Sequence, residues 1–186
     1  PVRQRRYQAK LSELQPKVQP SALQGAAQIY REALARAPQD HMLRDHFAKL
    51  LHASGELEAA IAEFQKVIEL LPHSSTAYFN IGQLLNSQNK FPEAESYFRL
   101  ALERTAHFAE AQIGLGSALL GQGKINAGIA AFSRALELRP GYWEAQMSLG
   151  QAWHRQGNLE KAKAWYTEAL RLNPASYSAQ LNMGNI

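Results

Sequence analysis

Histidine and carboxylate side chains are the residues of this sequence best able to bind a metal ion or transfer a proton, and it contains six histidines and sixteen carboxylates. His41 and Asp45 stand four residues apart, which places them on one face of a helix, and Asp45 has the same relation to Lys49. A metal site takes three or four protein ligands, whereas this cluster offers two. The spacing therefore predicts a helical ion pair or a solvated histidine, with no metal site and no cofactor.

Other arrangements that could support catalysis are weaker. His73 and His107 lie 34 residues apart. Histidines can sense pH or contact an acidic ligand, but we favour loop histidines without such a role. The sequence has no cysteine for thiol chemistry, no nucleophile elbow, and no glycine-rich loop that follows a strand. We therefore expect that the chain is not an enzyme.

Small residues, aromatic residues and prolines recur every 34 residues, and these series define the elements that position any functional side chain. The aromatic series is Tyr30, Phe64, Phe98, Phe132 and Tyr166. The proline series is Pro38, Pro72, Pro140 and Pro174, with Ala106 in the place of the missing member. A fixed period of this length is typical of a stacked array of repeats, not of a compact globule around one pocket.

The period divides the sequence into units. A half unit, 21–40, precedes the full units 41–74, 75–108, 109–142 and 143–176, and a partial unit, 177–186, follows them. The first twenty residues form a separate basic segment, with five basic residues and one acidic residue, and we expect this segment to be helical. Residues 21–186 carry fifteen charges of each sign, so the array itself is neutral.

Each full unit is predicted to fold as two antiparallel helices, helix A and then helix B. In the second unit, Ile81, Leu84 and Leu85 form the apolar stripe of helix A. Asn89 then marks the turn, and Pro92 is suited to the first turn of helix B. The other units have glycine where this unit has Asn89, and both residue types tolerate the left-handed backbone that ends a helix.

Glycine also recurs inside helix A, at Gly82, Gly116, Gly150 and Gly184, with Ala48 at the equivalent position of the first unit. A glycine in a helix costs about 1 kcal/mol relative to alanine. The repetition of this cost predicts that the backbone of helix B crosses too close for a side chain, with the aromatic residue of helix B filling the space beside it.

These residues together resemble the tetratricopeptide repeat family. One unit carries the full pattern, with Leu149-Gly150, Ala162, Tyr166, Ala169 and Pro174, while Phe47-Ala48, Gly128 and Ala106 depart from it elsewhere. The resemblance covers residues 21–186. It implies an all-α fold, an α-solenoid of antiparallel helix pairs that form a right-handed superhelix. It also implies a non-catalytic protein–protein interaction scaffold that binds a peptide or protein partner in a concave groove lined by helix A.

The groove should use the positions of helix A on either side of its core stripe. The predicted groove residues are Asp45, Lys49, His52, Phe79, Gln83, Asn86, Ile113, Ser117, Leu120, Met147, Gln151, His154 and Arg155. An apolar row runs through them at Phe79, Ile113 and Met147, and such rows usually mark interaction surfaces. The alternative is that these side chains pack against neighbouring helices A.

Three further interpretations concern the partners of the chain. It begins with Pro1 and stops within a helix A, which we interpret as an excised fragment of a larger enzyme or membrane-anchored protein that it could regulate. Self-association through the two ends would give a homo-oligomer. Nucleic-acid binding through Arg3, Arg5 and Arg6 is disfavoured, because a solvated basic segment explains them.

The composition gives little information on location. No apolar run approaches the roughly 18 residues that span a bilayer, so we expect no membrane span in this fragment. The absence of cysteine does not select a compartment. The sequence leaves the compartment unknown, and among the alternatives we favour a soluble fragment in the cytoplasm.

Overall fold

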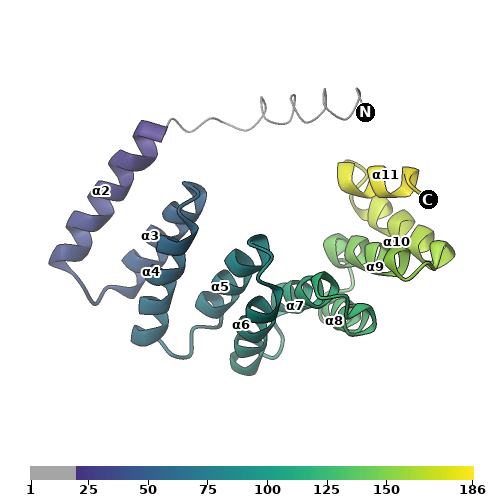
Figure 1. Cartoon of the computed structure of the whole chain (residues 1–186), viewed down its shortest axis with the longest axis horizontal. Helices are drawn as coiled ribbons and strands as arrows, with labels where there is room; N and C mark the ends of the chain where they lie inside the picture. The colour runs from purple at the N-terminus through teal and green to yellow at the C-terminus, as the bar shows by residue number, and fades with distance from the viewer. Residues whose placement is uncertain (1–19) are drawn as a thin grey trace.

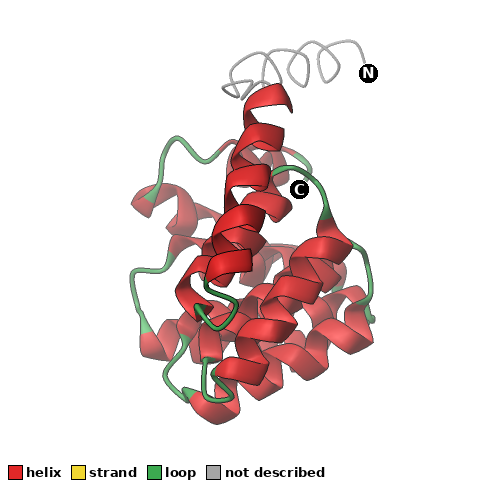
Figure 2. Ribbon diagram, turned by 90° about the vertical axis from the view of Figure 1, so that its left-hand side faces the viewer, coloured by secondary structure: helices red, strands yellow, loops and turns green. Residues whose placement is uncertain are grey.

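The computed structural model describes residues 20–186, and every regular element in this range is an α-helix (Figure 2). The helices are α2 (Pro20–Arg36), α3 (His41–Ala53), α4 (Leu57–Leu70), α5 (Ser75–Ser87), α6 (Phe91–Arg104), α7 (Ala109–Gly121), α8 (Ile125–Leu138), α9 (Trp143–Arg155), α10 (Leu159–Leu172) and α11 (Tyr177–Gly184). The prediction of a helix over residues 1–20 falls almost wholly outside the described residues, as do Arg3, Arg5 and Arg6.

The helices pair in sequence and the pairs stack into an arc that runs from α2 to α11 (Figure 1). In each pair the odd-numbered helix A packs against the even-numbered helix B that follows it. The helices A also contact one another in series, α5 with α7 and α7 with α9. The structure therefore confirms the predicted all-α solenoid, and it places the helices A on the inner side of the arc.

The turn between the two helices of each pair has the predicted left-handed residue. Asn89 has a φ of 60°, and Gly55, Gly123 and Gly157 at the equivalent positions have φ of 80°, 76° and 84°. This backbone conformation is easily adopted only by glycine and, less readily, by asparagine. The turn reverses the chain within three residues, which brings helix B directly back along helix A.

The core repeats one contact between a glycine of helix A and an aromatic ring of helix B. A Cβ atom at Gly82 would lie 2.8 Å from the ring of Phe98, which is 1% exposed. The corresponding pairs are Gly116 with Phe132 and Gly150 with Tyr166, both at 2.5 Å. The ring itself, and not the backbone of helix B, therefore occupies the space, which corrects the sequence-based prediction.

Polar side chains connect successive pairs along one edge of the stack. A glutamine follows each of three inner helices, and each donates its Nε2 hydrogen to the outer helix of the preceding pair. The acceptors are Glu58 for Gln88 at 3.1 Å, Glu95 for Gln122 at 2.6 Å and Asn126 for Gln156 at 2.6 Å. These hydrogen bonds link each helix pair to the pair before it.

Candidate peptide-binding groove

Five of the predicted groove residues meet around one cavity of about 350 Å³ on the inner surface, which we call the central cavity. They are Phe79, Gln83, Asn86, Ile113 and Ser117. The first three lie on α5 and the last two on the neighbouring helix α7. The stacking of helices A thus brings together residues more than thirty positions apart in the sequence.

The apolar wall of the central cavity is also part of the core. Phe79 is half-buried, and its ring centroid lies 5.9 Å from that of Phe98 and 4.9 Å from that of Phe108. Ile113 packs against the core around Phe132 and is likewise half-buried. Each of these two residues therefore packs against its neighbours, as the alternative interpretation expected, and each also lines the cavity, so the groove assignment stays a prediction.

The lining of the central cavity also has an acidic part, which the sequence reasoning missed. Glu110 and Glu144 occupy equivalent positions in the first turns of α7 and α9, and both line the cavity with Tyr142. The signal was present, because two glutamates stand 34 residues apart and each precedes a predicted groove residue, Ile113 or Met147, by three positions. That spacing places them on the same helical face.

Arg139 lies at this acidic side and shows its electrostatic character. Its Nη2 pairs with a carboxylate oxygen of Glu110 at 2.6 Å, and its guanidinium carbon lies 4.3 Å from the centroid of the Tyr142 ring. Burial raises the pKa of the Tyr142 hydroxyl, and the negative charges of Glu110 and Glu144 raise it further. Both carboxylates therefore act on the same point of the cavity wall.

The predicted groove residues of α3 lie elsewhere. Asp45 and Lys49 line a second cavity of about 260 Å³ together with His41. Asp45 and Lys49 form the expected ion pair, with 2.6 Å between Oδ2 and Nζ. His52 is exposed on α3 and lines neither cavity. The predicted groove residues of α3 therefore lie apart from those of α5 and α7, which line the central cavity.

The remaining predicted groove residues, on α7 and α9, differ in how deeply they are buried. Leu120 is 5% exposed and belongs to the core around Phe132, so its assignment to an open groove wall is wrong. Its backbone carbonyl accepts a hydrogen bond of 3.1 Å from Arg155, which therefore caps the end of α7. Met147 and His154 are half-buried on α9, whereas Gln151 is exposed.

Comparison with known families decides the identity of the fold. Residues 47–107 and 113–177, more than half of the chain, match the family described as Tetratricopeptide repeat. The chain belongs to the tetratricopeptide repeat (TPR) family. TPR arrays are typically protein-interaction scaffolds without catalytic activity of their own, and the solenoid described above is their fold.

Solved TPR structures share this fold. A crystal structure of MamA has 22% sequence identity and a TM-score of 0.74, and the alignment covers 83% of this chain and 90% of that one. The structure of MamA residues 41 to the end from Desulfovibrio magneticus RS-1 has 21% sequence identity and a TM-score of 0.75, and the alignment covers 84% of this chain and 88% of that one. Pseudomonas aeruginosa PilF has 20% sequence identity and a TM-score of 0.72, and the alignment covers 81% of this chain and 68% of that one. A comparison with curated protein sequences gives no match.

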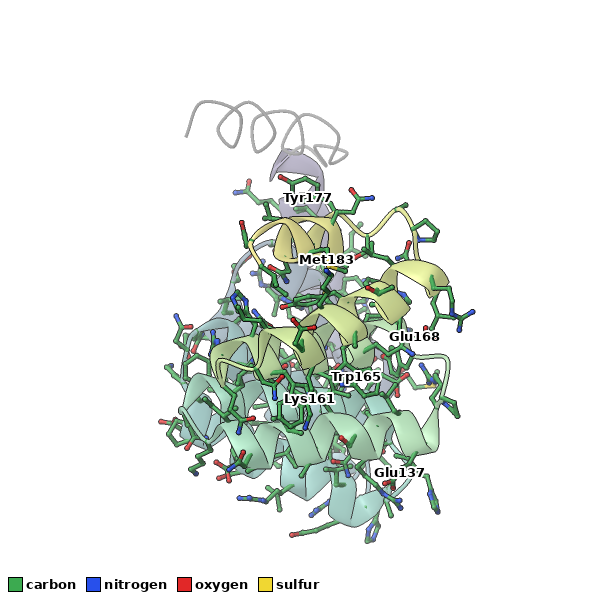
Figure 3. The ribbon with its side chains drawn as sticks, turned by 90° about the vertical axis from the view of Figure 1, so that its right-hand side faces the viewer. Glu137, Lys161, Trp165, Glu168, Tyr177 and Met183 are labelled. Carbon is green, nitrogen blue, oxygen red and sulfur yellow. The ribbon has the colours of Figure 1, made fainter. Side chains whose placement is uncertain are left out.

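The C-terminal end of the TPR array differs from its interior. Figure 3 shows α10 with Lys161 and Trp165, and α11 with Tyr177 and Met183. Gly184 has no atom within 4 Å of the place of a Cβ, in contrast to Gly150 one unit earlier. The described part of α11 therefore has no aromatic ring packed at this position.

No helix within residues 20–186 is both long and apolar enough to cross a bilayer.

Proposed function

We propose that this TPR array is a non-catalytic scaffold that binds a peptide or helical segment of a protein partner across α5, α7 and α9. The observation that supports the proposal is the central cavity, around which Phe79, Ile113 and Ser117 gather. Ligand sites are commonly concave, largely apolar and supplied with a few polar groups that fix orientation. The central cavity has this composition, and its size suits one or two inserted side chains.

The polar groups of the central cavity are suited to a peptide backbone. Gln83 and Ser117 lie at equivalent positions of neighbouring helices and line the cavity. Asn86 lies one turn beyond Gln83, and its Oδ1 is buried without a hydrogen-bond partner. An unsatisfied buried polar atom is costly, so a donor from a ligand would stabilise this arrangement. We infer that these side chains bind the backbone of a partner whose apolar side chain enters the cavity.

A substitution that fills the central cavity and leaves the core unchanged tests this proposal. Ser117→Arg places a long side chain in the cavity, and Lys49 at the equivalent position of α3 indicates that an inner helix accepts one. Ser133→Arg on the outer helix α8 is the matched control, because it adds the same charge and Arg99 occupies its equivalent position. Peptides selected from a random twelve-residue phage-display library on the unaltered protein serve as probes.

We expect the selected peptides to bind the unaltered protein and the Ser133→Arg variant equally well, and the Ser117→Arg variant at least tenfold more weakly. Fluorescence anisotropy of labelled peptides measures the dissociation constants, and circular dichroism checks that both variants remain folded. Equal affinity for both variants would contradict the proposal, and so would a selection that enriches no peptide.

A further inference from the structure

Glu144 is the only half-buried carboxylate without an ion pair among residues 23–186. Its neighbour Glu110 pairs with Arg139, whereas none of the basic side chains in this range pairs with Glu144. The other carboxylates of this range that lack an ion pair are exposed to solvent. A half-buried charge has lost part of its hydration, so an opposite charge placed beside it is stabilised more than at an open surface.

Glu144 lies at a helix start and at the wall of the central cavity. It lies in the first turn of α9, where the helix dipole favours a negative side chain. It also lines the central cavity together with Phe79 and Ile113. An apolar side chain and a cation that enter this cavity together would therefore find complementary surfaces side by side.

Arg139 already shows how this wall binds a cation. Its guanidinium group pairs with Glu110 and lies close to the ring of Tyr142, the residue two positions before Glu144. Arg139 comes from the end of the preceding outer helix and remains half-exposed, so it satisfies Glu110 only. Glu144 is a second carboxylate in the first turn of an inner helix, and no basic side chain within residues 23–186 pairs with it.

These observations rest on the proposed function and extend it to the chemistry of the partner. We propose that the central cavity selects a protein segment in which a lysine or arginine lies next to an apolar side chain, with the apolar group between Phe79 and Ile113 and the cation on Glu144. An acidic segment would be repelled by Glu144.

Three variants test this charge selection with the peptide library used above. Glu144→Gln removes the charge with little change in shape, and Glu144→Lys reverses it. Glu69→Lys is the control, because Glu69 is exposed on the outer helix α4, has no ion pair among residues 23–186 and does not line the central cavity. The readouts are the composition of the peptides selected on each protein, and the dissociation constants of the peptides selected on the unaltered one.

We expect the unaltered protein and Glu69→Lys to select peptides that combine an apolar residue with lysine or arginine. Glu144→Gln should weaken these peptides about tenfold, the loss expected for one charge-assisted hydrogen bond, and Glu144→Lys should select peptides without this basic residue. High salt should reduce the difference between the unaltered protein and Glu144→Gln.

The outcomes separate this inference from the proposed function. Peptides that lose affinity for Ser117→Arg but show no enrichment of basic residues, and that bind Glu144→Gln normally, would overturn the inference and leave the groove assignment in place. Peptides that bind Ser117→Arg as well as the unaltered protein would overturn both. A loss of affinity that is equal for Glu144→Lys and Glu69→Lys would show that net charge, not Glu144, sets the preference.

Discussion

The contact between Gly82 and Phe98 predicts a reversal in the effect of one substitution. The ring of Phe98 occupies the space where a Cβ of Gly82 would lie, 2.8 Å away, and it is almost completely buried. Gly82→Ala should gain about 1 kcal/mol of helix propensity and lose about 2 kcal/mol to overpacking against the ring. The expected net effect on the free energy of unfolding is a loss of about 1 kcal/mol.

Removal of the Phe98 ring should turn the destabilising effect of Gly82→Ala into a stabilising one. Phe98→Ala alone should cost about 3–5 kcal/mol, towards the upper end of that range because Gly82 and Gly114, which flank the ring, have no side chains to fill the space. In the Phe98→Ala background, Gly82→Ala meets no ring and keeps its helix propensity, so it should stabilise the protein by about 1 kcal/mol. The two substitutions are then coupled by about 2 kcal/mol.

Chemical denaturation of the four proteins, followed by circular dichroism at 222 nm, measures this coupling. Gly25→Ala provides the control, because Gly25 lies within α2 and a Cβ there would have no neighbour within 4 Å. It should stabilise the protein in either background. If Gly82→Ala also stabilises the unaltered protein, or if the two substitutions are additive within about 0.5 kcal/mol, the ring does not hold the position that we assign to it.

Two further predictions concern the connections between helices. Burial raises the pKa of the Glu95 carboxyl, but hydrogen bonds from Gln122 and Lys124 and the charge of Arg99 outweigh it, so the pKa lies below its usual value. Glu95 therefore stabilises the fold above about pH 4.3, and this contribution is lost as the pH falls through the pKa of the folded state. Melting temperatures measured between pH 6 and pH 3 should fall more steeply for the unaltered protein than for Glu95→Gln. Equal slopes for the two proteins would refute this reasoning. Asn89→Gly should raise the free energy of unfolding by about 0.5 kcal/mol, because its φ of 60° costs asparagine more than glycine, and a decrease in the denaturation midpoint would contradict this reasoning.

The helix pairs and their turns could be predicted from the sequence because the repeat presents the same local signal several times. Asn89 alone would be a weak turn signal, but glycine occupies the equivalent position in three other units, and all four residues have positive φ. The aromatic residue of helix B was likewise predicted as buried, and Phe98 is 1% exposed. Repetition thus makes the backbone predictable, since each unit must present the same surface to its neighbours.

The inner surface was less predictable because it depends on how neighbouring units face each other. Leu120 lies on the predicted groove face of α7 but is buried in the core around Phe132. The acidic wall forms because Glu110 and Glu144 from two different helices converge on Tyr142, and helical projection within one unit does not show this. Asp45, at the position equivalent to Ile113, pairs with Lys49 on its own helix and lies at a different cavity.

The residues that depart from the repeat are the ones that give the central cavity its shape. Gly114 lines this cavity, and a Cβ at its position would overlap the ring of Phe98. The other units carry a side chain there, His46, Asn80, Ser148 or Asn182. The absence of a side chain at Gly114 lets the Phe98 ring fit between α5 and α7 and leaves open the space beside Ile113. The 34-residue period therefore builds the solenoid, whereas the missing side chain at Gly114 and the two nearby glutamates give the central cavity the shape and charge on which the proposed binding depends.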